Sequence, residues 1–119
     1  MAWKFLSDSP VYLQIADRIR SSIVSGEYIP GQQLPTVRQF ATMAAVNPNT
    51  VQHAFSELED EGIIISRGTA GRFVTPDISE IDKCRRIQIK KLLDNFLSYA
   101  EQLSFSKREI IAMIEEDEK

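Results

Sequence analysis

Apolar residues recur at helical spacing at the start of the chain. Ser9 and Pro10 together form a typical helix start, with Ser9 as the N-cap and Pro10 at the first helical position. Gly26 is placed to end the helix. The stripe between them, with one apolar residue every four positions, consists of Val11, Ile15, Ile19 and Ile23. This spacing predicts one amphipathic helix.

Two further helices are predicted next, joined by the short turn at Ala45-Val46. Thr36 begins the first, which runs to about Ala44, and Asn47-Pro48 begins the second, which ends at Gly62. Their predicted buried faces are Val37, Phe40, Ala41 and Ala44 in one helix, and Val51, Ala54, Phe55 and Leu58 in the other. Helices joined so tightly cross steeply, as in a helix-turn-helix.

A β-hairpin is predicted after the third helix. Residues 63–67 are rich in β-branched side chains, residues 68–71 form a glycine-flanked turn, and residues 72–75 form a second short strand that Pro76 ends. The predicted fold class is therefore mainly α with a small β-hairpin, arranged as a winged helix-turn-helix over residues 1–76.

From Asp77 onward the pattern predicts a helical tail over residues 77–119. A long helix comes first, and the capping box Ser106-Lys-Arg-Glu109 begins a short last helix. The apolar stripe of the long helix needs a covering surface, and a second copy of the chain supplies one by two-fold symmetry. We therefore expect a dimerisation tail whose interface contains Ile89, Leu92, Leu93, Phe96, Leu97 and Leu103.

Composition excludes most enzyme classes. With one cysteine and one histidine among 119 residues, the chain cannot form an internal disulfide or a His-pair metal site, and no glycine-rich phosphate loop is present. We expect no enzyme activity, no cofactor and no bound metal. The sequence also lacks a membrane span and a secretory leader, so we expect a cytoplasmic protein.

The charge balance does not by itself indicate nucleic acid binding. Fourteen Lys and Arg residues face seventeen Asp and Glu residues, which gives a net charge of −3. A DNA-binding hypothesis must therefore depend on where particular side chains lie. An acidic winged helix could also serve as a protein–protein docking module, and we keep that as the alternative function.

The third helix carries a polar face opposite its apolar stripe. Asn49, Gln52, His53 and Ser56 point away from the predicted core, with Thr50 at the helix start. Asn and Gln side chains make paired hydrogen bonds to adenine in the major groove. The free N–H groups at the start of this helix suit a phosphate. We therefore interpret this face as a candidate DNA-reading surface, although His53 could also be an ordinary surface residue.

Three arginines extend the candidate surface. Arg38 lies near the start of the second helix, where it could reach the DNA backbone or a guanine. Arg67 and Arg72 flank the hairpin turn beside Gly68, and a thin glycine-containing wing suits a minor groove.

Each arginine also has an alternative interpretation. Arg38 could pair with Glu27 or Asp17, and Arg67 with the acidic run at 57–61. We expect that acidic run, together with Arg18 and Arg20, to form solvated helix surfaces, and Cys84 to be a small core or interface residue.

Four sequence blocks occur in a fixed order: GQQLPTVRQFA at 31–41, VNPNTV at 46–51, LEDEGI at 58–63 and RGTAGRFV at 67–74. Through these blocks the chain resembles the GntR family of bacterial winged-helix transcription regulators over roughly residues 10–75. The VNPNTV block and the short two-helix tail are similar to its YtrA-type subfamily. That resemblance implies a small homodimeric repressor, often encoded beside transporter genes.

The resemblance also implies which residues contact DNA. Matching positions are Thr36, Arg38, Asn47, Asn49, Thr50, Gln52, Arg67 and Gly68, to which the local chemistry adds His53 and Arg72. Many family members carry Ser/Thr-Arg where this chain has Asn47-Pro48, and Gln52 replaces a frequent arginine, so we expect more adenine and thymine readout. The expected partner is a double-stranded palindromic operator with half-sites about one helical turn apart. A small effector at the dimer interface is a further expectation, without a chemistry that the sequence selects.

Overall fold

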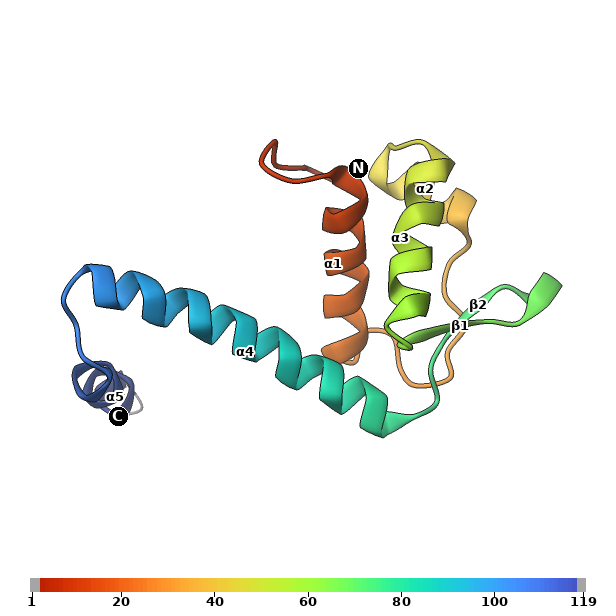
Figure 1. Cartoon of the computed structure of the whole chain (residues 1–119). Helices are drawn as coiled ribbons and strands as arrows, with labels where there is room; N and C mark the ends of the chain where they lie inside the picture. The colour runs from red at the N-terminus through yellow and green to blue at the C-terminus, as the bar shows by residue number, and fades with distance from the viewer. Residues whose placement is uncertain (1–2, 118–119) are drawn as a thin grey trace. The chain divides into compact units, whose positions relative to one another are not determined.

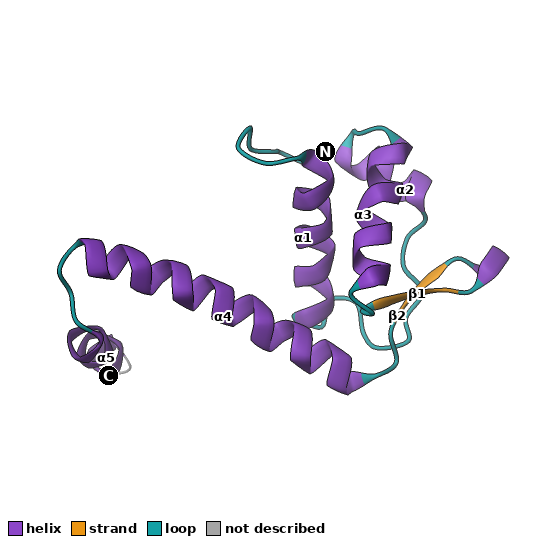
Figure 2. Ribbon diagram, viewed as in Figure 1, coloured by secondary structure: helices purple, strands orange, loops and turns teal. Residues whose placement is uncertain are grey.

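The computed structural model describes residues 3–117 and divides the chain into two compact units, one ending at Cys84 and one beginning at Arg85. Figures 1 and 2 show the elements in chain order. The first unit contains α1 (Val11–Val24), α2 (Val37–Ala44), α3 (Pro48–Asp60), β1 (Ile64–Ser66), the single-turn 3-10 helix η1 (Gly68–Ala70) and β2 (Arg72–Val74). The winged helix-turn-helix predicted from the sequence is confirmed.

The core of the first unit forms where the three helical stripes meet. α1 lies beside α3 in Figure 1, and both contribute fully buried residues. Phe40 of α2 meets Phe55 of α3 edge to face, with ring centroids 5.6 Å apart. The core includes Ile15, Ile19, Ile23, Phe40, Ala41, Val51, Ala54, Phe55, Leu58, Ile64 and Val74. Val11, which we predicted in the stripe, lies at its exposed end.

The start of α1 differs by one residue from the prediction. Pro10 is the N-cap, no side chain caps the helix, and the first helical residue is Val11. Gln14 instead holds the preceding segment, since its side-chain amide bonds the backbone N–H and C=O of Leu6 and the C=O of Ser9. Ser9 therefore takes part through its backbone and not as the predicted cap.

The turn between α2 and α3 follows the cap signals in the sequence. Thr36 and Gln39 form a complete capping box at the start of α2, and Asn47 accepts a hydrogen bond from the backbone N–H of Asn49 at the start of α3. Ala45 ends α2 in the left-handed conformation at φ +57°. This left-handed residue begins the turn between the two helices.

The wing is an antiparallel hairpin with an additional segment at its edge. Ile64 pairs with Val74 and Ser66 with Arg72. The segment before α2 pairs with β2 as well, because Leu34 donates to the C=O of Arg72 and Val74 donates to the C=O of Gln32. This third segment was not predicted from the sequence, since two to three paired residues leave no visible alternation of apolar and polar positions.

The first unit extends beyond residue 76, where the sequence analysis placed the end of the first domain. Helix α4 (Ile78–Gln102) begins in this unit, and its residues Ile81 and Cys84 are buried in the core cluster. Cys84 is therefore a core residue, one of the two positions that we expected for it.

The second unit contains the remainder of α4 and helix α5 (Lys107–Asp117). The predicted capping box is confirmed, because Ser106 Oγ accepts from the N–H of Glu109 at 3.2 Å and Glu109 Oε1 accepts from the N–H of Ser106 at 3.0 Å. Ala100 and Ile110 are buried, whereas most of the apolar stripe is exposed. None of the helices described is long and apolar enough to cross a membrane.

Candidate nucleic-acid interface

Helix α3 divides into a buried and an exposed face, as the sequence predicted. Val51, Ala54, Phe55 and Leu58 are at most 1% exposed. Asn49, Gln52, His53 and Ser56 are exposed on the other face. Helix α3 therefore offers amide and imidazole groups to the solvent along its first three turns.

His53 has a neighbour that the sequence analysis did not identify. Its imidazole stacks on the ring of Tyr12 in α1, with centroids 3.5 Å apart and planes 8° from parallel. One ring face of His53 is covered, while the residue as a whole stays exposed. No sequence signal connects Tyr12 with a residue in α3.

The remaining polar candidates at the helix starts also maintain local structure. The side-chain oxygens of Thr36 and Asn47 accept backbone hydrogen bonds as N-caps, and Thr50 is half-buried in the first turn of α3. Capping does not prevent a DNA contact, because the capping oxygen keeps a second lone pair for another donor. The DNA contacts of these residues therefore stay predictions.

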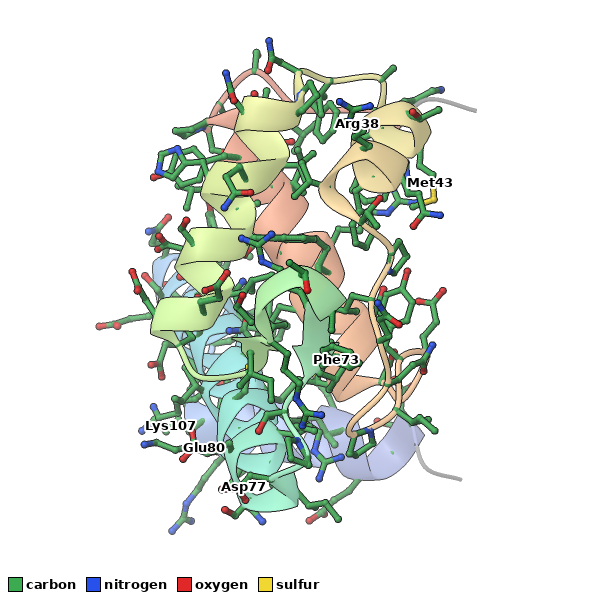
Figure 3. All side chains as sticks on the ribbon, turned by 90° about the vertical axis from the view of Figure 1, so that its right-hand side faces the viewer. Arg38, Met43, Phe73, Asp77, Glu80 and Lys107 are labelled. Carbon is green, nitrogen blue, oxygen red and sulfur yellow. The ribbon has the colours of Figure 1, made fainter. Side chains whose placement is uncertain are left out.

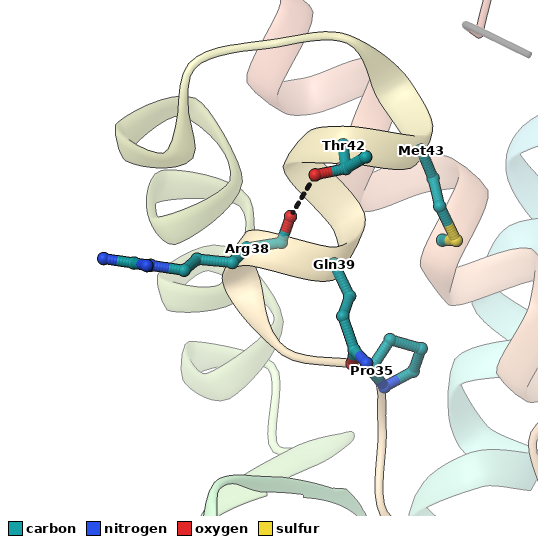
Figure 4. Close-up of a pocket in the computed structure, with 5 residues that line it drawn as sticks. All are labelled: Pro35, Arg38, Gln39, Thr42 and Met43. Carbon is teal, nitrogen blue, oxygen red and sulfur yellow. Dashed lines mark hydrogen bonds between the residues drawn. The ribbon is translucent and has the colours of Figure 1, made fainter.

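Arg38 extends from α2 into the solvent. Figure 4 shows its guanidinium directed away from the helix, whereas Gln39 turns back toward Pro35, and in Figure 3 Arg38 lies above the wing that carries Phe73. Within residues 3–117, Arg38 forms no ion pair, and Asp17, one of its two suggested partners, binds Arg20 instead. The positive charge of Arg38 is therefore uncompensated by a contacting carboxylate.

The two wing arginines differ in their surroundings. Arg67 is exposed, and its guanidinium carbon lies 4.9 Å from the centroid of the Phe73 ring. Arg72 is 23% exposed, and its Nε lies 3.1 Å from Glu59 Oε1 on α3. The ion pair that we considered for Arg67 with the acidic run is thus formed by Arg72, and Arg67 makes none in the described part of the chain.

The hairpin turn between these arginines requires glycine at one position in particular. Gly71 has φ +104°, and an added Cβ would lie 3.2 Å from Gln33 Nε2. Gln33 uses that nitrogen to donate to the C=O of Ala70 at 2.6 Å. The turn beside Gly68 is therefore thin and braced from the segment before α2.

The expectation that Arg20 forms a solvated surface is wrong, and two residues of the partly exposed acidic run, Glu59 and Glu61, are ion-paired. Arg20 is 6% exposed, and its guanidinium bonds Glu61 through two nitrogens and Asp17 through a third. Burial alone would lower the pKa of Arg20, but the hydrogen bonds and charges of Glu61 and Asp17 raise it above its ordinary value. Arg18, by contrast, is exposed and lies over the Trp3 ring.

These contacts change the electrostatics of the candidate surface. Glu59 and Glu61, at the end of α3, are paired with Arg72 and Arg20, whereas Arg38 and Arg67 form no ion pair in the described part of the chain. The local charge is therefore more favourable to an anionic partner than the net charge of −3 suggests. In the described residues no group of three or more His, Cys, Asp or Glu side chains is placed to hold a metal ion.

A helix-turn-helix that exposes a polar face on its second helix and is followed by a braced β-hairpin defines the class of winged-helix proteins. The family model for bacterial regulatory proteins of the gntR family matches residues 11–74. The chain belongs to this family, and it is a transcription regulator and not an enzyme.

Two relatives from Bacillus subtilis are similar in sequence. The HTH-type transcriptional regulator YhcF is 36% identical over 108 residues, which are 91% of this chain and 89% of YhcF. The HTH-type transcriptional repressor YtrA is 41% identical over 69 residues, which are 58% of this chain and 53% of YtrA.

Two solved structures are similar in fold. A GntR family transcriptional regulator from Listeria monocytogenes superposes with a TM-score of 0.88 at 37% identity, covering 94% of this chain and 98% of that one. The DNA-binding domain of AraR in complex with an operator superposes with a TM-score of 0.56 at 28% identity, covering 63% and 93%.

Proposed function

We propose that the protein is a sequence-specific DNA-binding repressor that reads its operator with the exposed face of α3. The observation that carries the proposal is the division of that helix into a fully buried apolar face and an exposed face with Asn49, Gln52 and His53. AraR, whose DNA-binding domain is similar in fold, was solved bound to an operator. YtrA, a relative in sequence, is a repressor.

Contacts to the DNA backbone come from the arginines in this proposal. Arg38 and Arg67 are exposed and unpaired within residues 3–117, and each neutralises one phosphate. Thr36, Asn47, Thr50 and Gly68 supply further hydrogen bonds at the helix starts and the wing. Asn49 and Gln52 make the base contacts, with adenine favoured by their amide groups.

The second unit makes the protein a homodimer in this proposal. Its exposed apolar side chains are too numerous for a free surface: Ile89 is 61% exposed, Leu92 64%, Leu93 45%, Phe96 52% and Leu103 72%, and Leu97 is half-buried. A second copy presents the same stripe and covers it by two-fold symmetry. The α3 helices of the two copies then bind the two half-sites of a palindromic operator, and these half-sites lie about one turn of the DNA helix apart.

The biological setting follows from the type of regulator proposed. Occupation of a promoter by the dimer blocks transcription, and the resemblance to the YtrA type points to a transporter operon as the target. A bacterial operator lies with the chromosome, so the proposal places the protein in the cytoplasm. If a small effector releases the DNA, a thermal-shift screen with and without operator duplex identifies it by a ligand-dependent change in melting temperature.

The alternative function, protein–protein docking without specific DNA binding, is favoured only by the acidic net charge. A binding titration distinguishes the two. The full chain is used to select duplexes from a random pool, and its affinity for the selected duplex is compared with that for random duplex over a range of salt concentrations. The repressor proposal predicts a preference of at least about a thousandfold and a steep salt dependence. Equal affinity for both duplexes would favour docking.

A further inference from the structure

Helix α3 and the wing are joined by a cluster of three side chains. The Nε of Arg72 on β2 donates to Glu59 Oε1 on α3 at 3.1 Å, and both side chains are less than a third exposed. The guanidinium carbon of Arg72 also lies 5.2 Å from the ring centroid of Phe55, one turn before Glu59. Phe55 is 1% exposed, so the cluster connects the wing to the core as well as to the helix surface.

Arg72 occupies the position from which the wing projects. It pairs with Ser66 as the last strand pair before the turn, and the N–H of Arg67 bonds the C=O of Gly71 at 2.9 Å inside that turn. A contact that fixes Arg72 against α3 therefore fixes the direction in which Arg67 and Gly68 point. Helix α3 and the turn must meet the same duplex, so their relative orientation governs whether both can bind.

We propose that Arg72 is a positioning residue, which orients the wing relative to α3 through Glu59, and that it does not itself contact DNA. The inference rests on the proposed function and replaces the sequence-based prediction of a DNA contact at Arg72. One observation separates Arg72 from Arg38 and Arg67: within residues 3–117 its charge is already paired with a carboxylate, that of Glu59, whereas neither of the other two arginines forms an ion pair. A guanidinium bound in this way has little charge left to offer a phosphate.

The two roles predict opposite effects of removing Glu59. If Arg72 positions the wing, Glu59→Ala and Arg72→Ala each weaken binding to the selected duplex by about three- to fivefold, as expected for a half-buried ion pair. The double variant then binds no more weakly than either single variant, because both substitutions remove the same contact. If Arg72 binds DNA, Glu59→Ala releases its guanidinium, and binding becomes tighter.

The salt dependence gives a readout that a loss of stability would not change. A phosphate contact contributes about 0.9 to the slope of log affinity against log salt. We expect the slope to stay at the wild-type value in Arg72→Ala and to fall by about 0.9 in Arg67→Ala, the arginine that directly follows β1 on the other side of the hairpin turn. A fall of that size in Arg72→Ala would overturn the inference.

Asp60→Ala is the matched control for Glu59→Ala. Asp60 is the next residue of α3, carries the same charge, is exposed and makes no ion pair within residues 3–117. Removing a negative charge near DNA raises the affinity for DNA to a similar extent in both variants. The difference in affinity between the two variants therefore gives the loss that is specific to Glu59. Equal affinities of the two variants would overturn the inference.

Amide hydrogen exchange tests the same contact without DNA. We expect the paired amides of β1 and β2 to exchange several-fold faster in Glu59→Ala and in Arg72→Ala than in Asp60→Ala. Unchanged exchange in the first two variants would overturn the positioning role even where DNA binding is intact. If the wild-type chain shows no preference for its selected duplex, the proposed function fails, and the exchange measurement still decides whether the contact holds the wing.

Discussion

The guanidinium of Arg20 donates two hydrogen bonds to the carboxylate of Glu61, Nε to Oε1 at 2.8 Å and Nη2 to Oε2 at 2.5 Å. The two residues are 41 positions apart and connect α1 with the end of α3. A bidentate arginine–carboxylate pair of this kind fixes the relative orientation of the two side chains as well as the distance between them. The helix that is proposed to read DNA is therefore held at its last turn by α1.

The Arg20 pair predicts a measurable loss of stability. Arg20→Ala leaves Glu61 without its bidentate partner and removes a side chain that is nearly buried. We expect the free energy of unfolding to fall by about 2 kcal/mol. For a unit of this size that cost lowers the melting temperature by roughly 10 °C. Arg18→Ala is the control, because Arg18 is exposed and its guanidinium lies over the Trp3 ring, with an expected cost of about 0.5 kcal/mol. Equal melting temperatures for the two variants would contradict the role given to Arg20.

The cap of α2 predicts a smaller effect with a conservative rescue. Thr36→Ala removes the acceptor for the N–H of Gln39 and is expected to cost about 1 kcal/mol. Thr36→Ser keeps the hydroxyl, and its free energy of unfolding is expected to lie within about 0.3 kcal/mol of the wild-type value, since Ser and Thr rank close together as N-caps. Chemical denaturation of both variants measures the difference. If Thr36→Ser were as unstable as Thr36→Ala, the lost stability would come from packing of the Thr36 methyl group and not from the capping hydroxyl.

The exposed stripe of α4 predicts the oligomeric state. Phe96→Asp places a charge in the proposed interface and is expected to convert a dimer into a monomer, as measured by sedimentation equilibrium. Operator affinity then falls by about 100-fold, because the second half-site is no longer bound by a linked domain. Lys91→Glu, which reverses an exposed charge on the opposite side of the same helix, is expected to stay dimeric. A wild-type chain that is monomeric at micromolar concentration would refute the homodimer.

Arg38 predicts a change in salt dependence without a change in fold. Arg38→Ala removes an exposed charge that forms no ion pair within residues 3–117, and we expect the slope of log affinity against log salt to fall by about 0.9 with the melting temperature unaltered. Arg18→Ala serves again as the control, since it removes an arginine outside the proposed surface. An unaltered slope in Arg38→Ala would remove this residue from the set of backbone contacts.

Much of the fold could be predicted because its signals are local. The spacing of Ile15, Ile19 and Ile23 and the cap signals at Thr36, Asn47 and Ser106 depend on residues within one or two turns of each other. The exposed face of α3 follows from the same periodicity. The start of α1 was misplaced by one residue, because a Ser-Pro pair does not show which of its two residues enters the helix.

The contacts that refine the site could not be predicted, because they join residues far apart in the chain. Nothing local distinguishes Arg20 from Arg18, yet one is buried against Glu61 and the other is exposed. Arg72 and Arg67 both flank the turn, and only the fold brings Glu59 to one of them. The first compact unit ends at Cys84 and not at residue 76, since Pro76 stops the strand while Ile81 and Cys84 still belong to the core.

Base readout by α3 is the central claim, and the specificity ratio tests it most directly. The affinities of the wild type, the Asn49→Ala, Gln52→Ala double variant and the Arg18→Ala control, which lies outside the proposed surface, are measured for the selected and the random duplex at one salt concentration. We predict that the double variant loses at least about 100-fold in affinity for the selected duplex while its affinity for random duplex is unchanged, and that Arg18→Ala keeps the wild-type preference. A double variant that retains the wild-type preference would contradict the account.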